Sequence, residues 1–269
     1  MKNLVCAGGG IKGFYYLGVI KALEEKNVIN KLEKLCGVSV GAIIVVLIAL
    51  NYSYNELYEI LINYNFDDIL EKDIFNMFNN YSIYGNNKKR RIIKILIKYK
   101  MNKENVTLRE LCEYSKKKIY IIATNVETGN EKIFNIDDDG DVDIIDIVCA
   151  SSALPILFPV IRINNNKYID GGFSKNYPLD IFKNDLENTI GINIEGVCIN
   201  KNINTMYNYI TNIIYIMFSN CGKHDYMEDA KINVHIYSNE NGCNFDITKK
   251  NKEDMIEDGY NKCINSFTD

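Results

Sequence analysis

Two hydrophobic patterns alternate along the chain. Short apolar runs rich in Val, Ile and Tyr predict strands, and apolar positions three or four residues apart predict helices. Strands are expected at 4–7, 32–36, 118–125, 131–136, 160–163, 167–169, 189–197 and 233–237. Helices are expected at 14–26, 42–50, 53–64, 86–103, 142–151, 204–219 and 250–267, and Thr107 with Glu110 has the spacing of a capping box that starts another. This alternation predicts an α/β fold: a three-layer sandwich with a mostly parallel central sheet flanked by helices.

The pattern contains no internal repeat and no linker rich in Gly, Pro or Ser. We therefore expect a single domain over 1–269, with 65–105 as a cap or insertion because 66–83 has no clean period. The acidic run 137–141 predicts a solvated turn, and it lacks the spacing of an EF-hand calcium loop. The apolar helix at 204–219 is expected to lie in the core.

Composition narrows the class of protein. The chain has 269 residues and a net charge of −4, which indicates no affinity for nucleic acid. Its 8 cysteines are dispersed, without a Cys-x-x-Cys pair, so we expect no disulfide framework. The N-terminus lacks a signal-peptide pattern, and the longest apolar run, 42–50, is too short to span a bilayer. These features predict a reduced, intracellular, cytoplasmic protein, and they indicate no oligomeric state.

The first candidate for chemistry is Gly37-Val38-Ser39-Val40-Gly41, a Gly-x-Ser-x-Gly sequence between a predicted strand and an apolar helix. This setting is typical of a nucleophile elbow, in which serine occupies a sharp strand-to-helix turn. Gly37 and Gly41 leave room for that turn, and Ser39 would adopt a strained conformation next to the positive end of the helix dipole.

A second glycine-rich turn, Gly8-Gly9-Gly10-Ile11-Lys12-Gly13, also joins a predicted strand to a helix. Its backbone N–H groups could converge on an anion, helped by the charge of Lys12. The spacing of Gly8, Gly10 and Gly13 equally matches the fingerprint of a Rossmann-like nucleotide-binding protein. However, the second strand ends without the acidic residue that this fingerprint requires, and a P-loop would need Gly-Lys followed by Ser or Thr.

A serine nucleophile also needs a base. Asp170, in Tyr168-Ile169-Asp170-Gly171-Gly172, ends a predicted strand, although an Asp before two glycines is also a common turn residue. A Ser–Asp–His triad would have to use His224 or His235, which are the 2 histidines of the chain. Each histidine is more readily interpreted as an ordinary structural or surface residue.

Four blocks together resemble the patatin-like phospholipases. They are the glycine turn at 8–13, the elbow at 37–41, Ala150-Ser151-Ser152-Ala153-Leu154-Pro155 with Phe158-Pro159-Val160, and Asp170-Gly171-Gly172. The blocks follow the order of that family and cover residues 5–178. Residues 180–269 carry no motif that we can match.

The resemblance implies a lipid acyl hydrolase with a Ser39–Asp170 dyad and an acyl-enzyme intermediate. The family's oxyanion hole would correspond to the turn formed by Gly8, Gly9, Gly10, Lys12 and Gly13, although the family usually has Arg where this chain has Lys12. No metal or cofactor is implied, and the expected partner is a lipid substrate.

The basic stretch 88–103 bears on how such an enzyme would meet a membrane. Its cations could attract anionic headgroups, with interleaved Ile residues inserting shallowly. The alternative is a solvated helix face above the site, and we favour this alternative.

Overall fold

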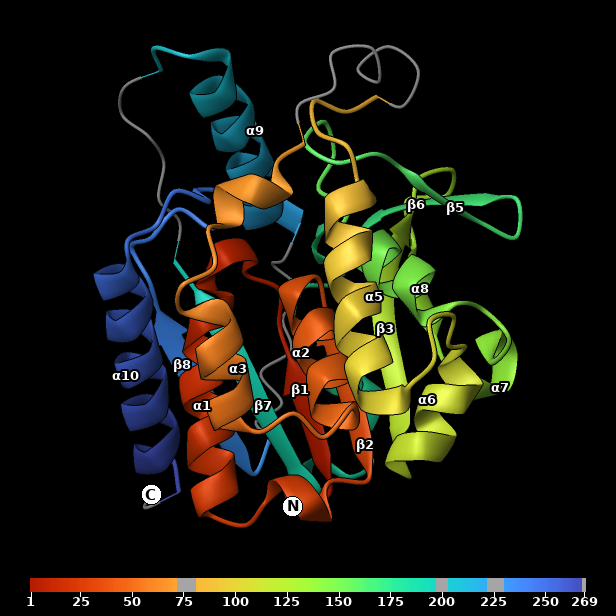
Figure 1. Ribbon diagram of the computed structural model, residues 1–269, viewed down its shortest axis with the longest axis vertical. Coiled ribbons are helices and arrows are strands. Elements are labelled where there is room, and N and C mark those ends of the chain that lie inside the picture. The colour runs from red at the N-terminus through yellow and green to blue at the C-terminus, as the bar shows by residue number, and fades with distance from the viewer. Residues whose placement is uncertain (72–80, 197–202, 222–229, 268–269) are drawn as a thin grey trace.

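The structure is a computed structural model that describes residues 1–71, 81–196, 203–221 and 230–267 (Figure 1). The strands are β1 Asn3–Cys6, β2 Lys34–Val38, β3 Lys118–Asn125, β4 Glu131–Phe134, β5 Ile161–Ile163, β6 Asn166–Asp170, β7 Thr189–Glu195 and β8 Ile232–Tyr237. The helices are α1 Phe14–Glu25, α2 Val40–Ala49, α3 Tyr54–Leu61, α5 Asn87–Met101, α6 Leu108–Ser115, α7 Ile136–Asp139, α8 Ile144–Ser151, α9 Met206–Cys221 and α10 Lys249–Asn265. Short 3-10 turns include Gly10–Gly13, Gly171–Phe173 and Leu179–Phe182.

The strands form one sheet in the order β5-β6-β3-β2-β1-β7-β8, and β4 pairs with β3 as well. Strands β3, β2, β1, β7 and β8 run parallel to one another. The antiparallel pairs involve β4, β5 and β6 at one side of the sheet. The carboxyl ends of the parallel strands therefore meet at one edge, where ligand sites of open α/β sheets usually lie.

Helices cover the sheet as the alternating pattern predicts. In the view of Figure 1, α1, α2, α5 and α10 lie in front of the strands. The main core joins the strand side chains Leu4 and Leu35 to α1 and α2. On the opposite face, Val5 and Val38 pack against the 3-10 turn at Leu179–Phe182. The predicted α/β class with a mostly parallel, helix-flanked sheet is confirmed.

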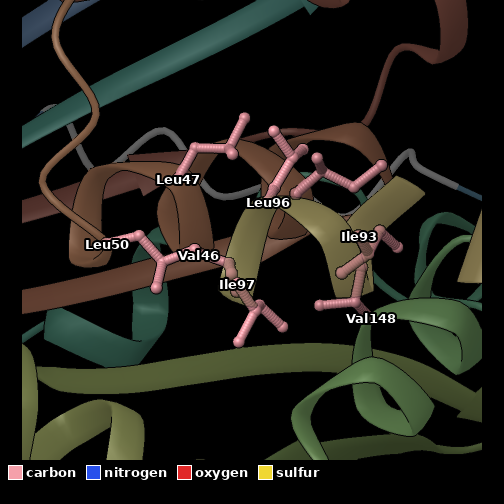
Figure 2. A pocket seen from close by; sticks show the side chains of 8 residues that line it. Val46, Leu47, Leu50, Ile93, Leu96, Ile97 and Val148 are labelled. Carbon is pink, nitrogen blue, oxygen red and sulfur yellow. The ribbon is translucent and has the colours of Figure 1, made fainter. Parts of the chain in front are cut away.

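The basic helix α5 is anchored to the main core. Figure 2 shows apolar side chains of α2 and α5 meeting Val148 of α8 around a cavity of about 10 Å³. Its walls are Ile43, Val46, Leu47 and Leu50 of α2, Ile93, Leu96 and Ile97 of α5, and Val148. A space of this size holds at most about one water molecule. The cavity therefore reflects helix packing and is too small for an acyl chain.

Two local predictions need correction. The acidic run at 137–141 is partly helical, because the side chain of Asn135 accepts hydrogen bonds from the N–H groups of Asp137 and Asp138 and caps α7. Acidic residues in a first helical turn are also favoured by the helix dipole. Helix α9 is only half in the core: Ile210 is buried, whereas Met206 is 71% exposed.

Six of the 8 cysteines can be examined. Cys6, Cys36, Cys112, Cys149, Cys243 and Cys263 are free and buried. Cys198 lies outside the described residues. Within the described ranges, no helix combines the length and the apolar character needed to cross a membrane.

Candidate active site

The segment around Ser39 forms a sharp turn from a strand into a helix. Strand β2 ends at Val38 and α2 begins at Val40, and Ser39 between them has a φ of +53°. A Cβ on Gly41 would lie 2.2 Å from the carbonyl oxygen of Cys6, and one on Gly37 would lie 2.4 Å from the carbonyl oxygen of Gly41. Since such separations are far shorter than van der Waals contact, Gly41 is required for α2 to pack against β1, and Gly37 is required for α2 to turn back over β2.

The sheet register explains why Asp170 lies beside Ser39. Val38 is paired with Ile122 of β3, and Ala123, the next residue of β3, is paired with Asp170 at the end of β6. The parallel strand β2 and the antiparallel strand β6 therefore end next to each other along β3. This brings together two residues that are 131 positions apart in the sequence.

Ser39 and Asp170 are in direct contact. Ser39 Oγ donates a hydrogen bond of 2.6 Å to Asp170 Oδ2, and the N–H of Gly172 donates to Asp170 Oδ1 at 2.9 Å. Asp170 is fully buried, and this burial raises the pKa of its carboxyl from 3.8 to about 6. The two hydrogen bonds and the positive charge of Lys89 oppose the rise. The carboxylate is thus a stronger base than a solvated aspartate.

The glycine turn lies against the serine. A Cβ on Gly8 would come within 3.2 Å of Ser39 Cβ, and Gly10 has a φ of +60°, which favours glycine. In the part of the chain that the structure describes, the N–H groups of Gly9 and Gly10 have no hydrogen-bond partner. An oxyanion hole needs N–H donors that are not already engaged, and these two groups, in the turn whose Gly8 contacts Ser39, meet that requirement.

The other two residues of the turn point elsewhere. Lys12 is buried, and its Nζ donates a hydrogen bond of 2.7 Å to the carbonyl oxygen of Gly196 after β7. Gly13 packs against Val40, because a Cβ there would meet Val40 Cγ2 at 2.5 Å. Gly13 thus fits the turn against the elbow, and a direct role of Lys12 or Gly13 toward an oxyanion stays a prediction.

Sequence reasoning overlooked the roles of two residues that hold the site. Ser151 is fully buried; its hydroxyl accepts a hydrogen bond of 2.9 Å from the N–H of Ser39 and donates to the carbonyl oxygen of Ile122. Asn176 accepts from the N–H of Gly8 through its backbone carbonyl, and its side chain lies beside Gly8. The Ala-Ser-Ser-Ala block contained a signal for Ser151, but its role could not be read without the fold.

The histidines do not assemble with the pair. His235 lies on β8, where its Nδ1 is 3.7 Å from Glu195 Oε1. No contact joins His235 to Asp170 within the described ranges, and His224 lies outside them. The structure thus offers no support for a Ser–Asp–His triad built on His235.

No group of three or more His, Cys, Asp or Glu residues suited to a metal ion occurs in 1–71, 81–196, 203–221 or 230–267. Two acidic residues of α7 have protein partners. Asp139 forms an ion pair with Lys132 at 2.9 Å, and Asp138 accepts from the side chain of Asn135.

Comparison with known families decides the assignment. The family model described as "Patatin-like phospholipase" matches residues 4–183, which include the elbow, the glycine turn and Asp170. The chain belongs to the patatin-like phospholipase family. The match ends before β7, so α9, α10 and the last two strands lie beyond it.

Two viral proteins resemble this patatin-like chain in sequence. Protein R571 of Acanthamoeba polyphaga mimivirus is 26% identical over 96% of this chain and 91% of its own length. "Probable lipid hydrolase 463L" of Invertebrate iridescent virus 6 is 31% identical over 67% of this chain and 62% of its own length.

Among solved structures, VipD from Legionella pneumophila superposes with a TM-score of 0.73 at 16% identity. The superposition covers 99% of this chain and 66% of VipD, so the patatin-like chain spans about two thirds of that protein. At this identity the likeness concerns the fold alone. It extends the patatin-like fold into residues 184–269, beyond the family match. Lipid hydrolysis as the class of activity is supported by the family and by the iridescent virus relative.

Proposed function

We propose that the protein is a serine lipid acyl hydrolase that cleaves carboxylic esters of phospholipids or related acyl lipids through Ser39 and Asp170. The observation that carries this proposal is the 2.6 Å hydrogen bond from Ser39 Oγ to the buried Asp170 carboxylate at a nucleophile elbow. Membership of the patatin-like family supplies the substrate class.

In the acylation step, Ser39 Oγ attacks the carbonyl carbon of the ester while Asp170 accepts the hydroxyl proton. The carbonyl oxygen becomes an oxyanion, and the unengaged N–H groups of Gly9 and Gly10 are the donors that we assign to it. The tetrahedral intermediate collapses as the C–O bond breaks, and the leaving alcohol or lysophospholipid takes the proton from Asp170. The acyl group remains on Ser39.

Deacylation repeats these steps with water. Asp170 accepts a proton from the water that attacks the acyl-enzyme, and it returns that proton to Ser39 Oγ when the fatty acid leaves. The N–H of Gly172 holds Oδ1 of Asp170, which leaves Oδ2 directed at the serine throughout. Ser151 holds the backbone N–H of Ser39 and thereby limits movement of the nucleophile.

Activity should depend on pH through Asp170. The base accepts a proton only when it is ionised, and its pKa is raised to about 6. We therefore expect kcat/KM for a soluble ester to be constant above this value and to fall about tenfold for each pH unit below it. Initial rates with a short-chain p-nitrophenyl ester across this range would measure the midpoint. A midpoint at the ordinary aspartate value, near 4, would contradict the assigned base.

The function as a whole is tested with the wild-type protein. We expect covalent labelling by a fluorophosphonate probe, together with release of fatty acid from phosphatidylcholine. A wild-type protein that neither reacts with the probe nor cleaves an ester would overturn the hydrolase proposal. If that inactive protein instead binds a dinucleotide in a separate titration, the result would favour the alternative, in which Gly8–Gly13 holds a nucleotide.

Contact with the lipid surface is better supported for α9 than for the basic stretch 88–103. Most cations of that stretch are engaged in ion pairs: Arg90 with Asp146, Lys94 and Lys98 with Glu104, Lys100 with Glu56, and Lys103 with Glu110. Because these partners neutralise the charge locally, the attraction of the helix to anionic headgroups is reduced. This favours the interpretation of 88–103 as a helix face of the protein.

Helix α9 carries no charged residue. Its inner face packs near the site, where the rings of Phe218 and Phe173 meet at a tilt with their centroids 4.3 Å apart. Its outer face exposes Tyr209, Ile216 and Met217 in addition to Met206. We propose that this face makes the transient contact with the membrane. An uncharged apolar surface beside the nucleophile would let a lipid pass from the bilayer to Ser39 without crossing water.

Replacing both Ile216 and Met217 with glutamate should slow hydrolysis of phospholipid in vesicles by about tenfold or more, since two apolar contacts are lost and charge is added. Hydrolysis of a soluble short-chain ester should stay within about twofold of wild type, because the replaced side chains do not contact Ser39 or Asp170. Ile60→Glu on α3, an exposed apolar position distant in sequence, is the matched control. Equal rates on vesicles for both variants would contradict a role of α9.

A further inference from the structure

Lys89 differs from the other cations of α5. It lies on the same face of the helix as Ile93 and Ile97, and it is 8% exposed. Exposed cations of α5 such as Lys94 and Lys98 form ion pairs with a carboxylate at the surface, whereas the side chain of Lys89 is directed into the protein. Burying an ammonium group is unfavourable unless its charge and its hydrogen bonds are compensated.

The contacts of Lys89 are carbonyl and hydroxyl oxygens and a ring. Its Nζ donates hydrogen bonds of 3.0 Å to the backbone oxygen of Ser152 and 3.1 Å to Ser152 Oγ. The ring centroid of Phe158 lies 4.4 Å from Nζ, within the range of a cation–π interaction. In the described part of the chain, no carboxylate oxygen lies within ion-pair distance of this ammonium. The positive charge is therefore buried and has no carboxylate in direct contact.

Three consecutive residues connect Lys89 to the reacting groups. Ser151 accepts from the N–H of Ser39, Ser152 accepts from Lys89, and the carbonyl oxygen of Ala153 accepts a 2.9 Å hydrogen bond from the N–H of Asp170. Residues 151–153 thus touch the nucleophile, the buried lysine and the base in turn. A displacement of this segment would move Ser39 and Asp170 relative to each other.

We propose that Lys89 is a positioning residue for the Ser39–Asp170 pair. It holds residues 151–153 through Ser152, and its positive charge favours the ionised form of Asp170. This inference rests on the proposed hydrolase function and extends it, because it gives the basic helix a role inside the site in addition to its place on the surface.

The charges around Asp170 determine in which direction its pKa should move when the charge of Lys89 is removed. Asp170 faces the hydroxyl of Ser39, the N–H of Gly172 and the charge of Lys89. Burial raises the pKa of the nearby Cys243 thiol, and the charge of Asp170 adds to that rise. Burial lowers the pKa of Lys89, an effect that Arg90 reinforces and that Cys149 and Asp170 oppose. Arg90 is itself paired with Asp146 at 2.5 Å. Removing the charge at Lys89 should therefore raise the pKa of Asp170.

The experiment compares Lys89→Met, Lys89→Gln and Lys89→Arg with wild type. Methionine removes charge and donor, glutamine keeps a donor without the charge, and arginine keeps the charge. We measure kcat and KM for a soluble short-chain ester from about pH 4 to about pH 9. For both neutral variants we expect the acid midpoint of kcat to move upward by roughly half a unit or more, with KM within about twofold of wild type. Lys89→Arg should keep the wild-type midpoint.

Lys88→Met is the matched control, because Lys88 is the preceding residue of α5 and is exposed. It should reproduce the wild-type profile. Thermal melting reports whether each variant folds, and if Lys89→Met does not fold, Lys89→Gln and Lys89→Arg decide. An unchanged midpoint in a folded neutral variant of an active enzyme would overturn the role of Lys89. Inactivity of the wild type would overturn the hydrolase proposal instead, so the two failures are distinguishable.

Discussion

The Ser39→Ala variant is expected to lose all covalent labelling by a fluorophosphonate and about 10⁴-fold or more of its ester hydrolysis. The Ser39 hydroxyl is the only nucleophilic group of the elbow sequence 37–41, and it is hydrogen-bonded to the proposed base Asp170. Its removal therefore removes the site at which the proposed acyl-enzyme forms. Mass spectrometry of the intact labelled protein measures the first effect. Initial rates with a soluble ester measure the second.

The fold should survive this substitution. Alanine removes only the Ser39 hydroxyl, and the backbone N–H whose hydrogen bond Ser151 accepts remains in place. Ser266→Ala serves as the control, because this serine lies at the exposed end of α10 and its hydroxyl donates to the carbonyl oxygen of Lys262. Stoichiometric labelling of Ser39→Ala would show that another residue is the nucleophile.

The Asp170→Asn variant should lose roughly 10²–10⁴-fold in kcat, the contribution of a positioned general base. An amide cannot accept the serine proton, yet its oxygen can still accept from the N–H of Gly172 and its nitrogen can donate to Ser39 Oγ. The arrangement of the pair should therefore be retained while turnover is lost. Single-turnover kinetics with a chromogenic ester would separate slow acylation from slow deacylation.

The same variant should be more stable than wild type at neutral pH. Because the pKa of Asp170 is higher in the folded protein than the ordinary 3.8, the folded state binds a proton more tightly than the unfolded state does. Stability is therefore lost as pH rises from about 4 to about 6, and the full penalty, on the order of 3 kcal/mol, applies above that range. The neutral amide of the Asp170→Asn variant carries no such penalty, so thermal melting at neutral pH should show a higher Tm.

Two further variants serve as controls for this experiment. Asp141→Asn changes an exposed carboxyl outside the site and should alter neither rate nor stability measurably. His235→Ala should keep most of the activity, because the imidazole of His235 faces Glu195. Full activity of Asp170→Asn, or complete inactivity of His235→Ala with its fold intact, would reverse the choice of base.

The stability penalty at Asp170 has a counterpart at Lys89. The carboxyl of Asp170 and the ammonium of Lys89 are both buried, and the charge of each favours the ionised form of the other. Such pairs of perturbed groups are concentrated at functional sites, where stability is exchanged for reactivity. The positive φ of Ser39 adds backbone strain at the same place. The unfavourable features of this fold thus gather around the proposed nucleophile.

The sequence by itself determined the features that depend on neighbouring residues. Hydrophobic period and capping chemistry predicted α5 and the start of α6, where Thr107 and Glu110 form the expected capping box. The glycines of the elbow predicted the strained turn at Ser39, because only glycine fits where two backbone segments approach so closely. The order of the four motifs was enough to indicate the patatin-like family.

Only the tertiary structure decided what depends on register and burial. The contact between Ser39 and Asp170 follows from the pairing of two different strands with adjacent residues of β3, and no local pattern encodes that register. The sequence does not distinguish Lys89 from the other cations of the basic helix. Its burial follows from the packing of α5 on α2 and α8. Likewise, α9 has an apolar composition that fits a core helix, and its packing leaves one face exposed. Local sequence sets backbone conformation, whereas long-range packing sets which side chains meet and which charges lose their water.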